Sequence, residues 1–159
     1  MNIQFINFLV EFITRAIPEC ISLTIFITAI LRLKIDWKKT IIIGTIVAFG
    51  VLVFRWLILS TGLHTAASII TLALLFASFY KVPKFKSLIA SIIGMLFLGT
   101  IELISFAFFK LAYNLDIHQL AQNKLLWDLS LWINIVVLLF SSYIIYRTKW
   151  YGRNISRIQ

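Results

Sequence analysis

Five long apolar runs divide the chain, and they constrain its fold more than any other feature of the sequence. A hydrocarbon core of about 30 Å is crossed by about 20 helical residues, and in lipid a helix satisfies all its backbone polar groups within one segment. The runs therefore predict an all-α, polytopic membrane bundle with five transmembrane helices, forming a single domain over residues 1–159. They cover about residues 5–31, 40–59, 64–80, 87–109 and 129–146.

The composition supports lipid as the solvent for this fold. Hydrophobic residues make up 61% of the chain and charged residues only 13%, about half the usual share in a soluble domain. The first run is longer than a bilayer requires. We therefore expect it to tilt, to kink at Pro18 or to begin as an interfacial turn.

The basic residues predict the orientation of the bundle. Segments 32–39, 81–86 and 147–159 carry four, three and four of the fifteen Lys and Arg residues. They are separated by pairs of runs, so they lie on one side of the membrane, and cytoplasmic connections are the ones rich in Lys and Arg. The expected topology is N-terminus out and C-terminus in, in a bacterial cytoplasmic membrane. The net charge of +9 thus reflects topology, and no nucleic-acid partner is expected.

The segment 110–128 is the largest connection predicted on the outer side. Five leucines in it are spaced to line one side of a short helix that lies on the membrane surface. An ordinary loop is the alternative. These leucines are Leu111, Leu115, Leu120, Leu125 and Leu126.

Ionisable residues inside the runs are the best lead to function, because each costs at least about 2.5 kcal/mol at the centre of a bilayer. In the predicted topology they all fall in the outer half of the membrane. The candidates for ligand binding or for a buried ion pair are Glu19, Arg55, His64, Glu102, Arg15 and Glu11.

Helical spacing places these residues and other polar groups in rows, each along one face of a predicted helix. We call these rows polar seams. Glu11, Arg15 and Glu19 are successive i,i+4 neighbours, and Gly44 and Ala48 share a stripe with Arg55 that lets another helix approach. We expect the seams of the separate helices to converge. Further seams consist of His64, Ser68, Thr71 and Ser78; of Ser91, Glu102 and Ser105; and of Ser130, Asn134 and Ser141.

Three arrangements are compatible with Arg55 in a membrane helix. In the first, Arg55 forms a buried ion pair with Glu102 or Glu19 that holds the helices in place and binds no ligand. In the second, it forms part of an outward-facing polar pocket. In the third, its side chain snorkels to the outer interface. The pocket would take a small molecule, a peptide or an ion.

No catalytic or cofactor motif is present in the sequence. Cys20 is the only cysteine, which excludes an intrachain disulfide and a CxxC pair, and we expect it to be a packed core thiol. The stretch Arg55, Gly62 and His64 loosely resembles that of Agr-type peptide-processing proteases, but their nucleophilic cysteine is replaced by Thr71 here. We therefore expect no enzymatic activity, no metal and no cofactor.

A second resemblance covers about residues 17–65. The stretches "IPE" (17–19) and "LRLKIDWKKTIIIGTIVAF" (31–49), followed by Arg55, Gly62, His64 and Thr65, resemble the membrane-embedded N-terminal module of bacterial GHKL/Agr-type sensor kinases. The resemblance implies a module that answers to extracellular signals. No kinase region follows here, so a protein partner would be needed.

These features favour a non-enzymatic sensing or regulatory module with a polar site in the outer half of the bundle. The alternatives are a substrate-binding or accessory subunit of a transporter, resembling those of energy-coupling-factor systems, and a scaffold in envelope assembly. The expected partners are the lipid bilayer, a small-molecule or peptide ligand, and a cytoplasmic or membrane protein. That protein would bind at 147–159 or at small-residue helix faces.

Overall fold

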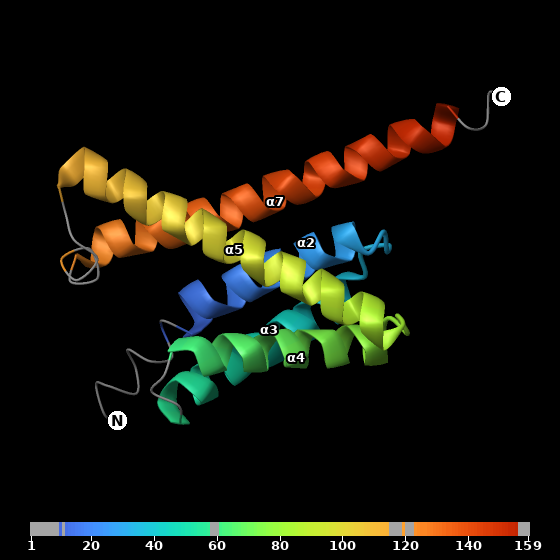
Figure 1. Ribbon diagram of the computed structural model, residues 1–159, viewed down its shortest axis with the longest axis horizontal. Coiled ribbons are helices and arrows are strands. Elements are labelled where there is room, and N and C mark those ends of the chain that lie inside the picture. The colour runs from blue at the N-terminus through green and yellow to red at the C-terminus, as the bar shows by residue number, and fades with distance from the viewer. Residues whose placement is uncertain (1–9, 11, 58–60, 115–118, 120–122, 156–159) are drawn as a thin grey trace.

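The computed structural model describes residues 10, 12–57, 61–114, 119 and 123–155 (Figure 1). This part of the chain is helical and contains no strand, which confirms the predicted all-α fold. The elements are the π-helical turn η1 (Phe12–Ala16) and the α-helices α2 (Ile17–Ile30), α3 (Trp37–Leu57), α4 (Thr61–Phe79), α5 (Lys84–Tyr113) and α7 (Lys124–Ile155).

Three helical segments of the described chain are long and apolar enough to cross a membrane. They are Phe12–Ile30, Lys84–Tyr113 and Leu125–Thr148, and Leu63–Phe79 is a shorter apolar helix. Large apolar side chains such as Leu103 on α5 and Phe140 on α7 are exposed on the outside of the bundle. The helices are thus compatible with a membrane protein, because lipid can cover such outward apolar faces.

Helix α2 is the centre of the bundle. It packs against α3, α5 and α7, while α4 packs between α3 and α5 (Figure 1). Residues from Ser22 to Ala29 are all buried, so every face of this part of α2 is covered. A helix that is apolar all round is suited to that central position. Its hydroxyl groups remain satisfied, since Thr24 and Thr28 each donate to the carbonyl four residues earlier at 2.7 Å.

Two glycines bring neighbouring helices close to α2. A Cβ atom at Gly44 of α3 would lie 2.7 Å from Cγ1 of Ile21, and one at Gly94 of α5 would lie 2.7 Å from Cγ1 of Ile27. Small residues at such positions allow helix backbones to approach closely. The predicted close approach at Gly44 and Ala48 is therefore present, and Ala48 is fully buried.

The first apolar run changes helix type just before Pro18. Residues 12–16 form the π-helical turn η1, and α2 starts at Ile17 with Pro18 in its first turn. Proline has no N–H to bond the carbonyl four residues earlier, and a π-type turn is one way in which a helix accommodates such a break. The run is therefore irregular where a kink was expected.

The connection between α5 and α7 is shorter than predicted. Helix α5 continues to Tyr113 and ends at Asn114, whose φ of 52° is a left-handed cap conformation that asparagine tolerates. Leu111 therefore belongs to α5, and Leu125 and Leu126 belong to α7 rather than to a separate surface helix. The predicted positions Leu115 and Leu120 lie outside the described residues.

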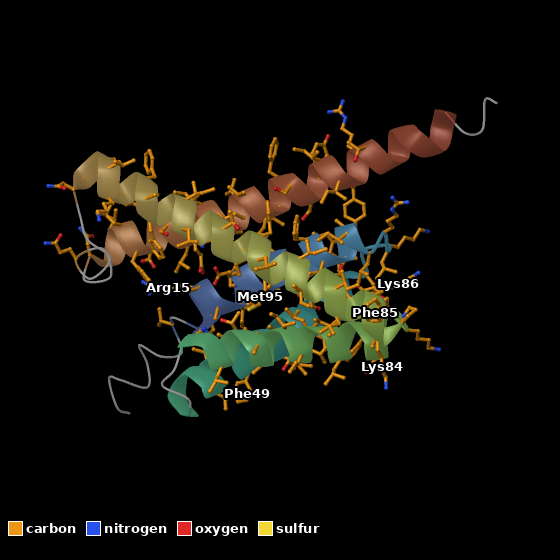
Figure 2. The ribbon with its side chains drawn as sticks, in the orientation of Figure 1. Arg15, Phe49, Lys84, Phe85, Lys86 and Met95 are labelled. Carbon is orange, nitrogen blue, oxygen red and sulfur yellow. The ribbon has the colours of Figure 1, made fainter. Side chains whose placement is uncertain are left out.

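Successive helices run in opposite directions, so the three basic segments share one end of the bundle (Figure 1). Lys84, Phe85 and Lys86 mark this end in Figure 2, and Arg15 lies toward the other. We call it the basic end, defined by segments 32–39, 81–86 and 147–155. Side-chain contacts join its elements: the hydroxyl of Tyr146 donates to the carbonyl of Leu33 at 3.0 Å.

Two serines one turn apart on α5 provide a test of this packing. Ser87 and Ser91 are both fully buried. The hydroxyl of Ser87 donates to the carbonyl of Ala73 on α4 at 2.6 Å, whereas Oγ of Ser91 has no hydrogen-bond partner in the part of the chain that the structure describes. The first hydroxyl joins two helices, and the second does not.

Ser87→Ala is expected to destabilise the protein by roughly 0.5–1.5 kcal/mol, because it removes an interhelical hydrogen bond in an apolar medium. Ser91→Ala removes only an unsatisfied buried hydroxyl, so we expect no loss and a gain of up to about 1 kcal/mol. Thermal unfolding of the two variants in the same detergent measures the difference. Equal destabilisation by both variants would contradict the hydrogen bonding described above.

Candidate functional site

A cavity lies among α2, α3, α4 and α5. Its volume is about 160 Å³. Polar groups and aliphatic side chains both line it, so it is not a void in a purely apolar core. The lining residues are Glu19, Cys20, Leu23, Val47, Val51, His64, Thr65, Ser68, Met95, Leu98, Gly99 and Glu102.

The bundle positions this cavity away from the basic end. Glu19 lies in the first turn of α2 and His64 in the first turn of α4, while Glu102 lies in the second half of α5. Because successive helices alternate in direction, these three positions share the half of the bundle opposite the basic segments (Figure 1). Met95 of α5, which also lines the cavity, lies near the middle of the bundle in Figure 2.

Three of the six predicted site residues thus line one cavity: Glu19, His64 and Glu102. Arg55 belongs to α3, one turn beyond the lining residue Val51, and its side chain lies outside the described part of the structure. Glu11 also lies outside the described residues.

Arg15 forms an ion pair that was not predicted from the sequence. Arg15 lies in η1, and its guanidinium forms an ion pair with the carboxylate of Asp128 on α7. The turn that holds Arg15 is π-helical and leads directly into α2. The ion pair joins the start of the first apolar run to the start of the last helix. Sequence analysis missed Asp128 because it lies at the edge of an apolar run, where an acid costs little.

The polar seams were expected to face the interior of the bundle. Several of their residues are buried there, but two of the predicted serines are not. Ser68 is buried and donates to the carbonyl of His64 at 2.8 Å. Ser105 of α5 donates to Oδ1 of Asn134 on α7 at 3.4 Å, so these two seams do converge. Ser78, however, is exposed. On α7 the predicted Ser130 is buried, but Ser142 is buried in place of the predicted Ser141.

Two further lining residues were not singled out as site residues. Cys20 is buried, as expected of a core thiol, but it also borders the cavity. At Gly99 a Cβ atom would meet no other atom within 4 Å, so the cavity has free space beside this position. Only their neighbourhood in the fold distinguishes them from the other small residues of the runs.

The described residues that line the cavity include both apolar and polar side chains. Among the described residues, no three His, Cys, Asp or Glu side chains are placed to hold a metal ion together. Ligand sites commonly combine apolar walls with a few convergent polar groups, which is the combination found here.

Comparison with known proteins returns no match: no family model, no curated protein and no solved structure matches this chain.

Proposed function

We propose that this protein is a five-span sensing or regulatory module of a bacterial cytoplasmic membrane, which binds a ligand in the outer half of its bundle. The observation that carries the proposal is the cavity to which three separate helices contribute Glu19, His64 and Glu102. Ionisable side chains are rarely buried in membrane helices without a functional or pairing role. The proposed role is binding, not catalysis.

The distribution of charge supports the orientation of the module. With the basic end in the cytoplasm, the N-terminus is outside, the C-terminus is inside and the cavity is in the outer half. Arg55 is expected to pair there with Glu102 or Glu19, and α3 brings it one turn beyond Val51 of the cavity wall.

Helix α7 offers a route from the cavity to a partner. The ion pair between Arg15 and Asp128 ties α7 to the segment that leads into Glu19. From there α7 continues as one helix to Ile155, and its basic C-terminal part projects beyond the other helices in Figure 1. A movement of η1 on ligand binding would displace α7, and a protein partner at the basic end would detect it.

The resemblance of residues 17–65 to sensor-kinase membrane modules supports a sensing role. Seven of the twelve lining residues come from this stretch: Glu19, Cys20, Leu23, Val47, Val51, His64 and Thr65. A substrate-binding subunit of a transporter is the second candidate, because it also requires a cavity that opens outward.

Native mass spectrometry of the protein extracted in mild detergent tests the proposal. We expect the chain to retain a small molecule, and Arg55→Ala to weaken that retention. A photo-crosslinker at the exposed position Arg147 separates the two candidates, since a sensing module should crosslink to a signalling protein and a transport subunit to the transporter. A chain that carries no ligand under any mild extraction would contradict both.

The orientation can be tested by chemical labelling. In a Cys20→Ser background, a cysteine introduced by Lys84→Cys should not react with a membrane-impermeant thiol reagent added outside intact cells, because Lys84 lies at the basic end. The same cysteine should react fully once the cells are permeabilised. Complete reaction in intact cells would reverse the proposed topology.

A further inference from the structure

We infer that the basic end of the bundle binds the headgroups of anionic phospholipids. The inference rests on the membrane-spanning arrangement proposed above, but it concerns the end of the bundle opposite the cavity and so goes beyond the proposed function. It is supported by the charge of the basic end, by its position relative to the apolar helices and by the side chains that lie beside its cations.

The positive charge of the basic end is almost unopposed. Its three segments carry ten Lys and Arg residues and a single acid, Asp36. The carboxylate of Asp36 lies 3.8 Å from Nζ of Lys39 and accepts hydrogen bonds from the backbone N–H groups of Lys38 and Lys39. It therefore neutralises no more than one of the ten cations. An excess of this size favours an anionic partner.

Seven of these cations are exposed and available to such a partner. Three of them lie in segment 32–39, three lie in segment 81–86, and the seventh is Arg147 on α7. None of the seven forms an ion pair with another described residue. Because two connections and one helix contribute to the set, the charge belongs to the whole end of the bundle and not to one helix.

In the proposed topology these cations lie at the level of the lipid headgroups. The apolar segment Phe12–Ile30 ends two residues before Arg32, and the apolar helix Leu63–Phe79 ends two residues before Lys81. Trp37, at the start of α3, is 62% exposed at the same end. An exposed tryptophan beside lysines and arginines is typical of the membrane–water interface.

The side chains beside the cations indicate a lipid as the partner. On α3, α5 and α7 an exposed cation has an exposed isoleucine three residues away, which places both on one face of the helix, and the isoleucine is nearer the middle of the bundle. Such a pair matches both the headgroup and the acyl chains of a lipid, whereas a nucleic acid or a soluble acidic protein would match only the cation. The pairs are Lys38 with Ile41, Lys86 with Ile89, and Arg147 with Ile144.

The charge of the basic end selects among phospholipids. Phosphatidylcholine and phosphatidylglycerol share the phosphate group, but the choline of the first is a cation and would be repelled by the exposed lysines. The glycerol of the second is neutral and leaves the attraction to the phosphate unopposed. We therefore expect phosphatidylglycerol to be favoured over phosphatidylcholine at this end.

A fluorophore at Phe85 tests this preference, because Phe85 lies between Lys84 and Lys86 and is 73% exposed (Figure 2). In a Cys20→Ser background, Phe85→Cys is labelled with bimane and the full-length protein is reconstituted into phosphatidylcholine vesicles. Its quenching is compared for equal amounts of phosphatidylglycerol and phosphatidylcholine that carry a nitroxide at the same shallow acyl position. We expect the anionic lipid to associate at least about threefold more strongly. In 1 M salt, where the screening length is about 3 Å, the preference should disappear.

The other end of the same helix provides the matched control. Tyr113 is also exposed, and the segment 110–128 beside it carries two lysines and two aspartates. Bimane at Tyr113→Cys should therefore be quenched equally by the two lipids. In the Phe85→Cys protein, Lys84→Gln together with Lys86→Gln should lower the preference at least about twofold. Lys84→Arg together with Lys86→Arg should retain it, because the charge is kept.

The outcomes separate this inference from the proposed function. Equal quenching by the two lipids at Phe85→Cys, or the same preference at Phe85→Cys and Tyr113→Cys, would overturn the inference and leave the cavity and its ligand untouched. A preference that survives both high salt and the glutamine variant would overturn it as well. Absence of quenching by either lipid at both positions would show that the chain does not lie in the bilayer, and would overturn the proposed function with it.

Discussion

Gly44→Ala is expected to destabilise the protein by about 1–3 kcal/mol, the usual cost of overpacking a well-packed interior. A Cβ atom at this position would lie 3.0 Å from both the Cα and the backbone nitrogen of Ile21, as well as 2.7 Å from its Cγ1. A side chain can rotate away from such a contact, but the backbone of α2 is held by neighbours on all sides. The two helices would have to separate, and the packing around the centre of the bundle would be lost.

Gly50 is the matched control on the same helix. A Cβ atom at Gly50 would meet no atom within 4 Å. Gly50→Ala is therefore expected to be neutral or to stabilise the protein by up to about 1 kcal/mol, through the higher helix propensity of alanine. Thermal unfolding in mild detergent, followed by tryptophan fluorescence, measures both variants. Similar stabilities for the two would be inconsistent with close packing of α3 on α2 at Gly44.

Gly99→Leu should close the cavity without disturbing the fold. Gly99 borders the cavity, and its surroundings leave room for added atoms. A leucine here would place four carbon atoms in or beside the space that we assign to the ligand. In the detergent-solubilised protein, we expect the modification of Cys20 by methyl methanethiosulfonate, a small neutral thiol reagent, to slow at least about tenfold, which corresponds to about 1.4 kcal/mol. Ligand retained by the unaltered protein should be lost to a similar extent.

Gly50→Leu is the control for this variant, because it adds the same side chain at a position with equal space outside the cavity. It should leave the modification of Cys20 unchanged. Unfolding temperatures close to that of the unaltered protein would show that both variants fold. Unimpaired labelling in a folded Gly99→Leu protein would mean that reagents reach Cys20 by a route other than this cavity.

The candidate site was partly accessible to prediction from the sequence. Glu19, His64 and Glu102 stand out because ionisable residues are costly in apolar runs, and the alternation of helix direction puts them at one level. Asp128 and Gly99 could not be found in this way. An acid near the end of an apolar run is unremarkable, and a glycine becomes part of a site only through the atoms that surround it.

Seam predictions failed where helix rotation mattered. Ser141 and Ser142 differ by one residue, or about 100° around an α-helix. Periodicity measured from distant polar residues cannot resolve that difference over three turns, but the neighbouring helices do, since they bury Ser142 and leave Ser141 partly exposed. The ion pair between Arg15 and Asp128 likewise joins segments far apart in the chain, and no sequence period indicated it.

The all-α fold, the approximate extent of each described helix and the gathering of the basic segments at one end could be predicted from the sequence. These properties follow from the length of the apolar runs and from the number of helices between charged segments. Both quantities can be read directly from the sequence, without knowledge of which helices are in contact. Three features could be learned only from the packing of the helices: α2 is the central helix, α3 and α5 approach it at Gly44 and Gly94, and a cavity remains beside Glu19, His64 and Glu102. Such features depend on how side chains of distant segments fit together, because close packing is a property of surfaces in contact and not of any one segment.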